Sequence, residues 1–415
     1  MSDWKKTTVG EVATAFLSGG TPNTKRPDYW EGEIPWITSK WLGSNLELTT
    51  GEKFVSEEAV KKTSTKVVPK DSIIFATRVG VGKVGINRLD LAINQDLAGV
   101  LIDNERYDIK FLAYQLKIDS IQQYVAMNKR GATIKGITRD CLEQVRLNLP
   151  PLPEQKKIAH IVSTVERAIE AQERIIQTTT ELKKALMHKL FTEGLRNEPQ
   201  KQTEIGPVPE SWETPAVESV CLIKASAMSY KQLEDAPNVA TGVRVIGIKV
   251  SDMNLLGNEI EFRSANLERQ LAEKEALKRA VPANSIVFPK RGAAIATNKK
   301  RLTTGYTVLD PNLIAVMPTE AVNHRYLFHW FNTFDLKNIT DPGPTPQLNK
   351  KDIAPLKFPM PPVDEQEAIA AAIDAAEQKA TMHARKRDQL QDLFHTLLRE
   401  LMTAKTRVDK LETTT

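Results

Sequence analysis

A glycine-rich stretch is the first place in this sequence where residue types and spacing could do chemistry. Gly80-Val81-Gly82-Lys83-Val84-Gly85 has the spacing of a dinucleotide-binding loop and follows a predicted strand. Such a loop needs a helix that begins inside it, because the helix N-terminus binds the pyrophosphate. The next residues, Ile86-Asn87-Arg88, do not open an amphipathic helix. The stretch therefore predicts a tight turn between two strands, and no nucleotide cofactor.

Other residues that often form catalytic or metal sites are scattered. The six histidines lie apart, four of them in segments predicted to be long helices, and none has metal-ligand spacing with a cysteine or carboxylate. The two cysteines, Cys141 and Cys221, cannot build a disulfide framework. We expect no catalytic residue, no cofactor and no metal on this chain, although a loosely patterned nuclease site remains an alternative.

Basic residues are concentrated in loops, although the chain as a whole, with 57 basic and 52 acidic residues, has a net charge of only +5. No acidic residue occurs at 72–89 or at 276–309. Loops rich in Arg, Lys, Gly and Thr suit a phosphate backbone, and arginine can also pair with guanine. A solvated surface is the alternative. The candidate DNA-binding residues are Arg78, Lys83, Arg88, Lys129, Arg130, Lys135, Lys290, Arg291, Lys299, Lys300 and Arg301.

The second half of the sequence repeats the first with an offset near 211 residues. Pro150-Pro151-Leu152-Pro153-Glu154-Gln155 matches Pro361-Pro362-Val363-Asp364-Glu365-Gln366, and 68–75 matches 281–288. An arginine follows three residues after each of the latter segments, and a tryptophan, Trp4 or Trp212, opens each copy. A repeat this long indicates a duplicated domain and excludes a solenoid.

Each copy contains a mixed domain followed by a long helix. Short β-branched runs predict strands at 72–75, 84–86, 100–102, 243–250 and 285–288, and helices are expected at 107–124 and 323–334. Apolar residues then recur with coiled-coil spacing from Ile158 to Leu190 and from Ile369 to Leu401. A helix of about 40 residues cannot bury such a stripe alone, so we expect the two helices to pair antiparallel. Contact with another protein, or a plain helical hairpin, are the alternatives.

The predicted fold class is α+β, with two similar mixed α/β recognition domains, two long antiparallel coiled-coil helices and an internal pseudo-two-fold repeat. The segment 197–211 carries three prolines and few apolar residues, as a linker does. The expected boundaries are a first domain at 1–150, a central helix at 151–196, a linker at 197–211, a second domain at 212–360, a C-terminal helix at 361–407 and a tail at 408–415.

This layout resembles the specificity subunit of type I restriction–modification enzymes. The resemblance rests on the Pro-Pro-x-x-Glu-Gln elements at 150–155 and 361–366 and on the segment 203–212, which contains Gly-Pro-Val-Pro-Glu-Ser-Trp. It covers essentially the whole chain. The second element reads Val-Asp where the first reads Leu-Pro, which leaves a capping residue at the helix start.

The resemblance implies a non-catalytic subunit in which each domain reads one half of a bipartite, asymmetric target in double-stranded DNA. The helices would set the spacer and dock two DNA-methyltransferase subunits, which restriction (translocase) subunits would join. S-adenosylmethionine, ATP and magnesium would belong to those partners. Since no apolar run of 18 residues and no secretory leader is seen, a cytoplasmic protein without a membrane segment is expected. The alternative function is a coiled-coil scaffold without specific DNA binding.

Overall fold

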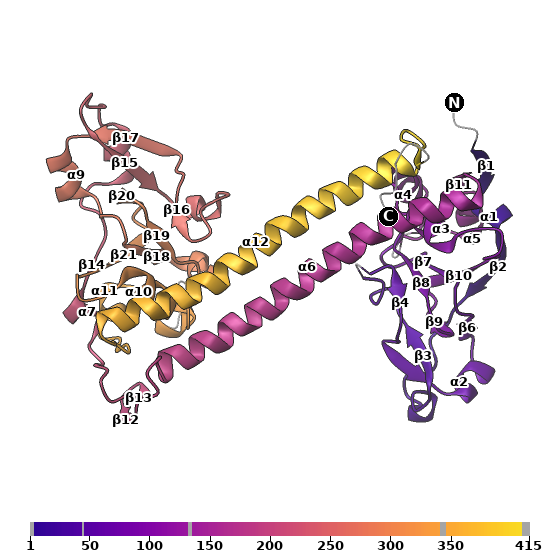
Figure 1. The fold of residues 1–415 in the computed structure, drawn as a ribbon, viewed down its shortest axis with the longest axis horizontal. Helices are drawn as coiled ribbons and strands as arrows, with labels where there is room; N and C mark the ends of the chain where they lie inside the picture. The colour runs from indigo at the N-terminus through magenta and orange to yellow at the C-terminus, as the bar shows by residue number, and fades with distance from the viewer. Residues whose placement is uncertain (1–3, 44, 132–134, 341–345, 409–415) are drawn as a thin grey trace. The chain divides into compact units, whose positions relative to one another are not determined.

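A computed structural model describes residues 4–43, 45–131, 135–340 and 346–408. The chain forms two compact units, residues 1–175 with 383–415 and residues 176–382. Each unit contains one globular domain and part of both long helices, α6 (Leu152–Thr192) and α12 (Val363–Leu401) (Figure 1). Among the described residues, none of the helices combines the length and the apolar character of a membrane span.

The first unit is built on two sheets. The five-stranded sheet has the order β2 (Ala13–Ser18), β10 (Leu97–Ile102), β7 (Ile73–Ala76), β8 (Val84–Asn87) and β4 (Glu47–Leu48). The four-stranded sheet has the order β5 (Lys53–Val55), β3 (Ile34–Ile37), β9 (Leu91–Ile93) and β6 (Lys66–Val68), and β1 (Lys5–Thr8) pairs with β11 (Arg146–Leu149). The strands predicted at 72–75, 84–86 and 100–102 are confirmed as β7, β8 and β10, with slightly different ends.

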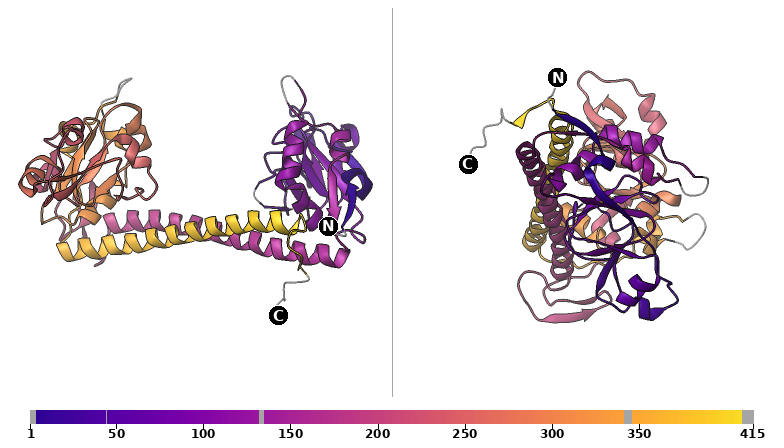
Figure 2. Two further views of the ribbon diagram at one scale, coloured as in Figure 1. Left: turned by 90° about the horizontal axis from the view of Figure 1, so that it is seen from above. Right: turned by 90° about the vertical axis from the view of Figure 1, so that its right-hand side faces the viewer.

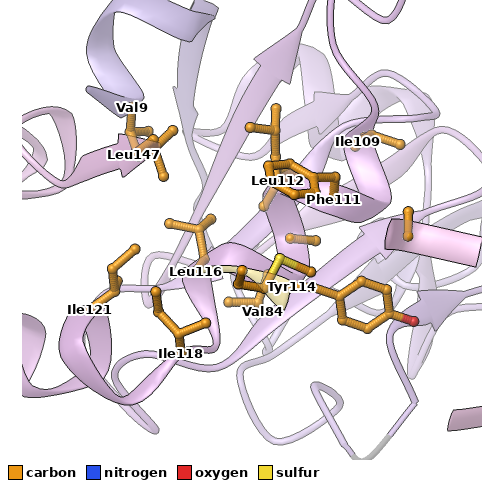
Figure 3. Close-up of a cluster of buried hydrophobic side chains, with 14 of the residues drawn as sticks. Val9, Val84, Ile109, Phe111, Leu112, Tyr114, Leu116, Ile118, Ile121 and Leu147 are labelled. Atoms are coloured by element: carbon orange, nitrogen blue, oxygen red, sulfur yellow. The ribbon is translucent and has the colours of Figure 1, made fainter. Parts of the chain in front are cut away.

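The helices that cover the first domain's main core are α1 (Val9–Val12), α3 (Ile109–Leu116), α4 (Asp119–Met127) and α5 (Arg139–Glu143). Another helix, α2 (Glu57–Lys62), packs in a separate cluster with Trp36 and Val55 of the four-stranded sheet. The buried face of α3 carries Phe111, Leu112, Tyr114 and Leu116, which belong to one buried cluster with Val84 of β8 (Figure 3).

The single helix predicted at 107–124 is wrong, because the chain breaks between α3 and α4. Ile118 is extended, with φ −68° and ψ 149°. The Leu116 carbonyl, freed by the break, accepts a hydrogen bond of 2.7 Å from the Gln122 side chain instead. A side-chain donor has replaced a helical N–H, which periodicity alone does not reveal.

The second unit repeats this plan. Its five-stranded sheet has the order β14 (Cys221–Lys224), β21 (Leu313–Pro318), β18 (Ile286–Pro289), β19 (Arg301–Thr303) and β16 (Glu261–Phe262). A three-stranded sheet has the order β17 (Leu267–Leu271), β15 (Val243–Ile248) and β20 (Tyr306–Leu309), and the linker forms the hairpin β12 (Gln200–Thr203) and β13 (Gly206–Pro209). Its helices include α7 (Val217–Val220), α8 (Tyr230–Glu234), α9 (Glu273–Arg279), α10 (His324–Phe331) and α11 (Lys350–Ile353).

The repeated glutamine fastens each domain to the start of its own long helix. Gln155 is buried, accepts a hydrogen bond of 3.0 Å from the Asp108 N–H and donates one of 2.8 Å to the Pro150 carbonyl. Gln366 does the same with the Asn323 N–H (2.8 Å) and the Pro361 carbonyl (2.9 Å). Asp108 and Asn323 are the N-caps of α3 and α10. The motif therefore joins the helix that covers each core to the long helix that follows it.

The repeated glutamate joins the start of one long helix to the chain that follows the other. Glu154 binds Arg407 through two contacts of 2.9 and 3.1 Å. In the second unit, Glu365 lies 3.5 Å from Arg196 and accepts a hydrogen bond of 2.8 Å from the Leu195 N–H. Within each unit these pairs place the start of one helix beside the end of the other.

The apolar stripes of the two helices pack together within each unit, where the helices run side by side in opposite directions (Figure 2). In the first unit Ile158 and Val162 share a core with Leu398 and Leu401. In the second unit Leu190 and Phe191 share a core with Ile369 and Ile373. The predicted antiparallel pairing is confirmed, and so is the α+β fold with two repeated domains.

Replacing Gln366 with alanine tests the glutamine clamp, the pair of buried hydrogen bonds by which Gln366 joins α10 to α12. The change leaves the Asn323 N–H and the Pro361 carbonyl without their buried partner, so the free energy of unfolding should fall by about 2 kcal/mol. Urea denaturation measures it. Gln177→Ala on the exposed face of α6 is the matched control and should change the free energy by less than about 0.5 kcal/mol. Equal effects of the two variants would contradict the clamp.

Candidate nucleic-acid interface

In the first unit, the loops that follow β3, β7 and β9 emerge at one edge of the domain. β3 and β9 are parallel, and the Asn94 N–H donates to the Ile37 carbonyl at 3.1 Å where both strands end. The chain then turns into β10, and the Thr77 N–H at the end of β7 donates to the Asp96 carbonyl at 2.8 Å. Arg78 and Lys83 lie in the turn that leaves this edge, and both are exposed.

Two short stretches, 129–131 and 135–137, pack onto the same turn. The Ile137 N–H donates to the Thr77 carbonyl at 2.8 Å, and Arg130 pairs with Gly136 through two backbone hydrogen bonds. A Cβ at Gly136 would lie 2.6 Å from the Thr77 carbonyl oxygen, so only glycine permits this approach. Exposed Lys129, Arg130 and Lys135 are thereby brought beside Arg78. Residues 132–134 lie outside the described part of the chain.

The glycine-rich stretch forms the expected tight turn between β7 and β8. Gly80 and Gly82 have φ angles of +66° and +97°, which side-chain-bearing residues rarely adopt. The Gln122 side chain donates to the Gly82 carbonyl at 2.9 Å and holds the turn. The residues that follow are strand β8, so no helix begins inside the loop.

The second unit builds the same edge from its own loops. The Lys290 N–H after β18 donates to the Asn312 carbonyl at 2.8 Å, just as Thr77 contacts Asp96. The Leu348 N–H donates to the Lys290 carbonyl at 2.9 Å, and Arg291 pairs with Gln347. Arg291 is exposed at this edge, where it is the counterpart of Arg78.

Three of the eleven predicted residues occupy positions that do not suit a phosphate contact. Arg88 binds both Asp71 and Glu47, which neutralise its charge. Lys300 is only 1% exposed and donates to the Phe334 carbonyl at 2.9 Å. Burial lowers the pKa of Lys300 to about 8. Arg301 donates to the Lys300 and Met253 carbonyls.

These three positions show that a sequence run without acidic residues predicts exposed cations only in part. A sequence run shows which charges are near in the chain, whereas burial and pairing depend on other loops. We therefore leave Arg88, Lys300 and Arg301 out of the candidate interface. It consists of Arg78, Lys83, Lys129, Arg130 and Lys135 in the first unit and Lys290, Arg291 and Lys299 in the second.

Lys290 and Lys299 are held less freely than Arg291. Lys290 is half-buried, and burial together with the charge of Arg291 lowers its pKa. An anion beside both groups would relieve that repulsion. Lys299 donates to the Asn254 side chain and so links its loop to the segment that follows β15.

One group of side chains in the second unit has metal-ligand geometry that the sequence did not reveal. Ligand atoms of His329, Asp374 and Glu377 lie within 4.8 Å of one another. However, Asp374 already binds Arg325, and Glu377 binds Lys183 at 2.8 Å. Arg325 and Lys183 already neutralise the two carboxylates that a metal ion would need as charged ligands. The group is accordingly an ion-pair network that ties α10 to α12 and α6.

The duplicated fold and its two cationic edges define a class of protein in which two similar domains, each with basic loops at one edge, are joined to paired long helices. The family described as type I restriction modification DNA specificity domain matches residues 1–180 and 209–392, and the chain belongs to that family.

Individual relatives agree with the family match. The type I restriction enzyme MjaIX specificity subunit of Methanocaldococcus jannaschii is 24% identical over 425 residues, which cover 99% of this chain and 95% of that protein. The EcoR124I/EcoR124II specificity subunit of Escherichia coli is 30% identical over 165 residues, or 39% of this chain and 40% of that protein. The S subunit of a type I restriction–modification system from M. genitalium has the same fold, with a TM-score of 0.60, 16% identity and 96% of each chain covered.

Replacing Asp374 with asparagine tests the ion-pair network through its pH dependence. Burial opposes ionisation of Asp374, but hydrogen bonds from His329 and Arg325 outweigh it and lower its pKa from 3.8 to about 2. A depressed folded pKa contributes stability above pH 4 that is lost as the pH falls towards 2. The variant should lose about 2 kcal/mol of unfolding free energy at pH 7, measured by urea denaturation.

The difference between the variant and the wild type should shrink between pH 4 and pH 2. Asp388→Asn is the matched control, because Asp388 is exposed and pairs only with its neighbour Arg387 among the described residues. A difference that stays constant over this pH range would show that the network does not lower the pKa of Asp374.

Proposed function

We propose that this chain is the non-catalytic DNA sequence-recognition subunit of a type I restriction–modification complex. Each globular domain binds one half of a bipartite, asymmetric target in double-stranded DNA. The long helices set the length of the spacer between the half-sites and dock two DNA-methyltransferase subunits, which restriction subunits join.

The observation that carries this proposal is the repeated edge. In both units a loop-to-loop contact holds an exposed arginine, Arg78 or Arg291, near further cations, which are exposed in the first unit and half-buried in the second. Arginine on a fixed backbone can pair with guanine, and neighbouring lysines suit phosphates. Two equivalent edges in one chain suit two separate half-sites. Membership of the DNA specificity family points to the same ligand.

The outer surface of the helix pair supports partner docking. Leu182 and Met382 are 60% and 59% exposed in the second unit, and Leu393 is 44% exposed in the first. A partner that covers these side chains would gain free energy from their burial. None of the candidate interface residues lies on α6 or α12, so the proposed docking surface is separate from the proposed DNA contacts.

Footprinting of the chain assembled with its methyltransferase tests the proposal. Two protected tracts separated by an unprotected spacer are expected, and binding should weaken steeply as salt rises, because phosphate contacts release counterions. Sequencing of modified bases in the host genome identifies the target beforehand. A single contiguous footprint, or binding insensitive to salt, would favour a scaffold without sequence recognition.

Alanine at Arg78 or at Arg291 should affect only one half-site each. Losing one arginine–guanine contact should weaken binding by about ten-fold and relax the preference at one base pair, as measured by competition with single-base variants of the target. Arg244→Ala is the matched control, because Arg244 is neutralised by Glu268. Loss at both half-sites from either variant would contradict the assignment of one domain to each tract.

Lengthening the helix pair should lengthen the preferred spacer. Four residues inserted at 178–180, with four more at 380–382, add about 6 Å of helix, or roughly two base pairs. The two sites are opposite each other because Lys183 binds Glu377 nearby. Selection from a pool of targets with variable spacers measures the preference. As a control, four residues added in the hairpin turn at 204–205 should leave the preferred spacer unchanged. If the two helix insertions also left the preferred spacer unchanged, that result would contradict the role of the helices.

A further inference from the structure

The second domain carries one leucine whose side chain is almost entirely in solvent. Leu256 is 93% exposed, more than any other large hydrophobic residue in the described part of the chain. It occupies the tip of a β-turn in which the Asn258 N–H donates to the Leu255 carbonyl at 3.0 Å. Gly257 has a φ of +91°, as the third position of a type II turn requires.

The turn that presents Leu256 is fixed by buried polar side chains. Asn258 is fully buried, donates to the Asp252 and Ser264 carbonyls at 2.9 and 2.8 Å, and accepts from the Arg263 and Ser264 N–H groups. Asp252 is also buried and accepts from the Lys249 N–H at 2.7 Å. All of these bonds are made inside the loop, so the tip is held in place without any contact from Leu256 itself.

This turn lies at the cationic edge of the second domain. It leads directly into β16, which runs parallel to β19, and the Leu302 N–H donates to the Ile260 carbonyl at 2.8 Å. Arg301 donates to the Met253 carbonyl at 3.2 Å, and Lys299 binds Asn254. Glu259, the acidic residue nearest the tip in sequence, accepts from the Gly257 N–H at 3.0 Å. The segment that carries Leu256 is therefore joined to the loop of Lys299 and to the start of β19.

An apolar side chain held in water on a rigid turn gains free energy only when a ligand encloses it. DNA offers such an enclosure between adjacent base pairs, where Leu, Phe or Met side chains act as wedges. Contact with a thymine methyl group would cover only one side of Leu256, whereas insertion covers the whole exposed side chain. Lys299, which contacts the same segment, can bind a phosphate beside the opened step.

Resting on the proposed function, we infer that Leu256 inserts between two adjacent base pairs of the half-site bound by the second domain. The side chain partly unstacks one step and bends the duplex there. It thereby makes binding depend on how easily that step opens, in addition to the bases that the arginines contact.

The test uses the full chain assembled with its methyltransferase subunits and bound to its target duplex. 2-Aminopurine, which fluoresces when unstacked, replaces the purines of the half-site one at a time. The wild type should raise fluorescence several-fold at one step, and Leu256→Ala should remove that signal and weaken binding about ten-fold. Leu256→Met should retain both. Any signal from a base that the methyltransferase extrudes is distinguished because it persists in Leu256→Ala.

Leu277→Ala is the matched control, because Leu277 is 61% exposed on α9 of the same domain. It should leave fluorescence and affinity unchanged. A bipartite footprint with no fluorescence signal that depends on Leu256 would overturn the wedge and leave the proposed function intact. Loss of methyltransferase association in Leu256→Ala, with unchanged fluorescence, would also overturn it and assign Leu256 to a protein contact. Absence of any bipartite footprint would instead refute the proposed function.

Discussion

In both units, the glutamate near the start of one long helix binds the arginine that follows the end of the other. Glu154 pairs with Arg407 and Glu365 with Arg196, and both residues of each kind are 211 positions apart. A buried or half-buried carboxylate needs a partner, and here the partner comes from the opposite repeat. This constraint fixes the antiparallel direction of the helices, since a parallel pair would bring the two glutamates together.

A small number of contacts connects the long helices to the basic loops at the domain edges. Gln155 and Gln366 hold the N-caps of α3 and α10, whose apolar faces pack on the five-stranded sheets. The ends of β7 and β18 then place Arg78 and Arg291 at the domain edge. Because each step is a buried hydrogen bond or a packed core, the exposed arginines stand on a rigid base, while the loop tips remain free to vary without cost to the core.

Much of the fold followed from patterns that repeat. The two long helices, their antiparallel pairing and most of the tested strands were predicted correctly, because periodic apolar residues report local burial. The helix at 107–124 was wrong because the Gln122 side chain satisfies a carbonyl that periodicity assumes to be bonded within the helix. The residues of the candidate site were harder to predict from the sequence. Arg88 and Lys300 looked like their neighbours in the sequence, yet one is neutralised by Asp71 and Glu47 and the other is buried.

The sequence by itself determined the duplication, the long helices and the regions where basic loops occur, since these depend on residue types and on their spacing along the chain. Only the tertiary structure decided which cations reach solvent, which loops meet at one edge, and that Leu256 stands exposed on a clamped turn. The physical reason is that exposure and charge pairing depend on residues that are distant in sequence. Glu47 meets Arg88, and Phe334 covers Lys300, through contacts that no local pattern records.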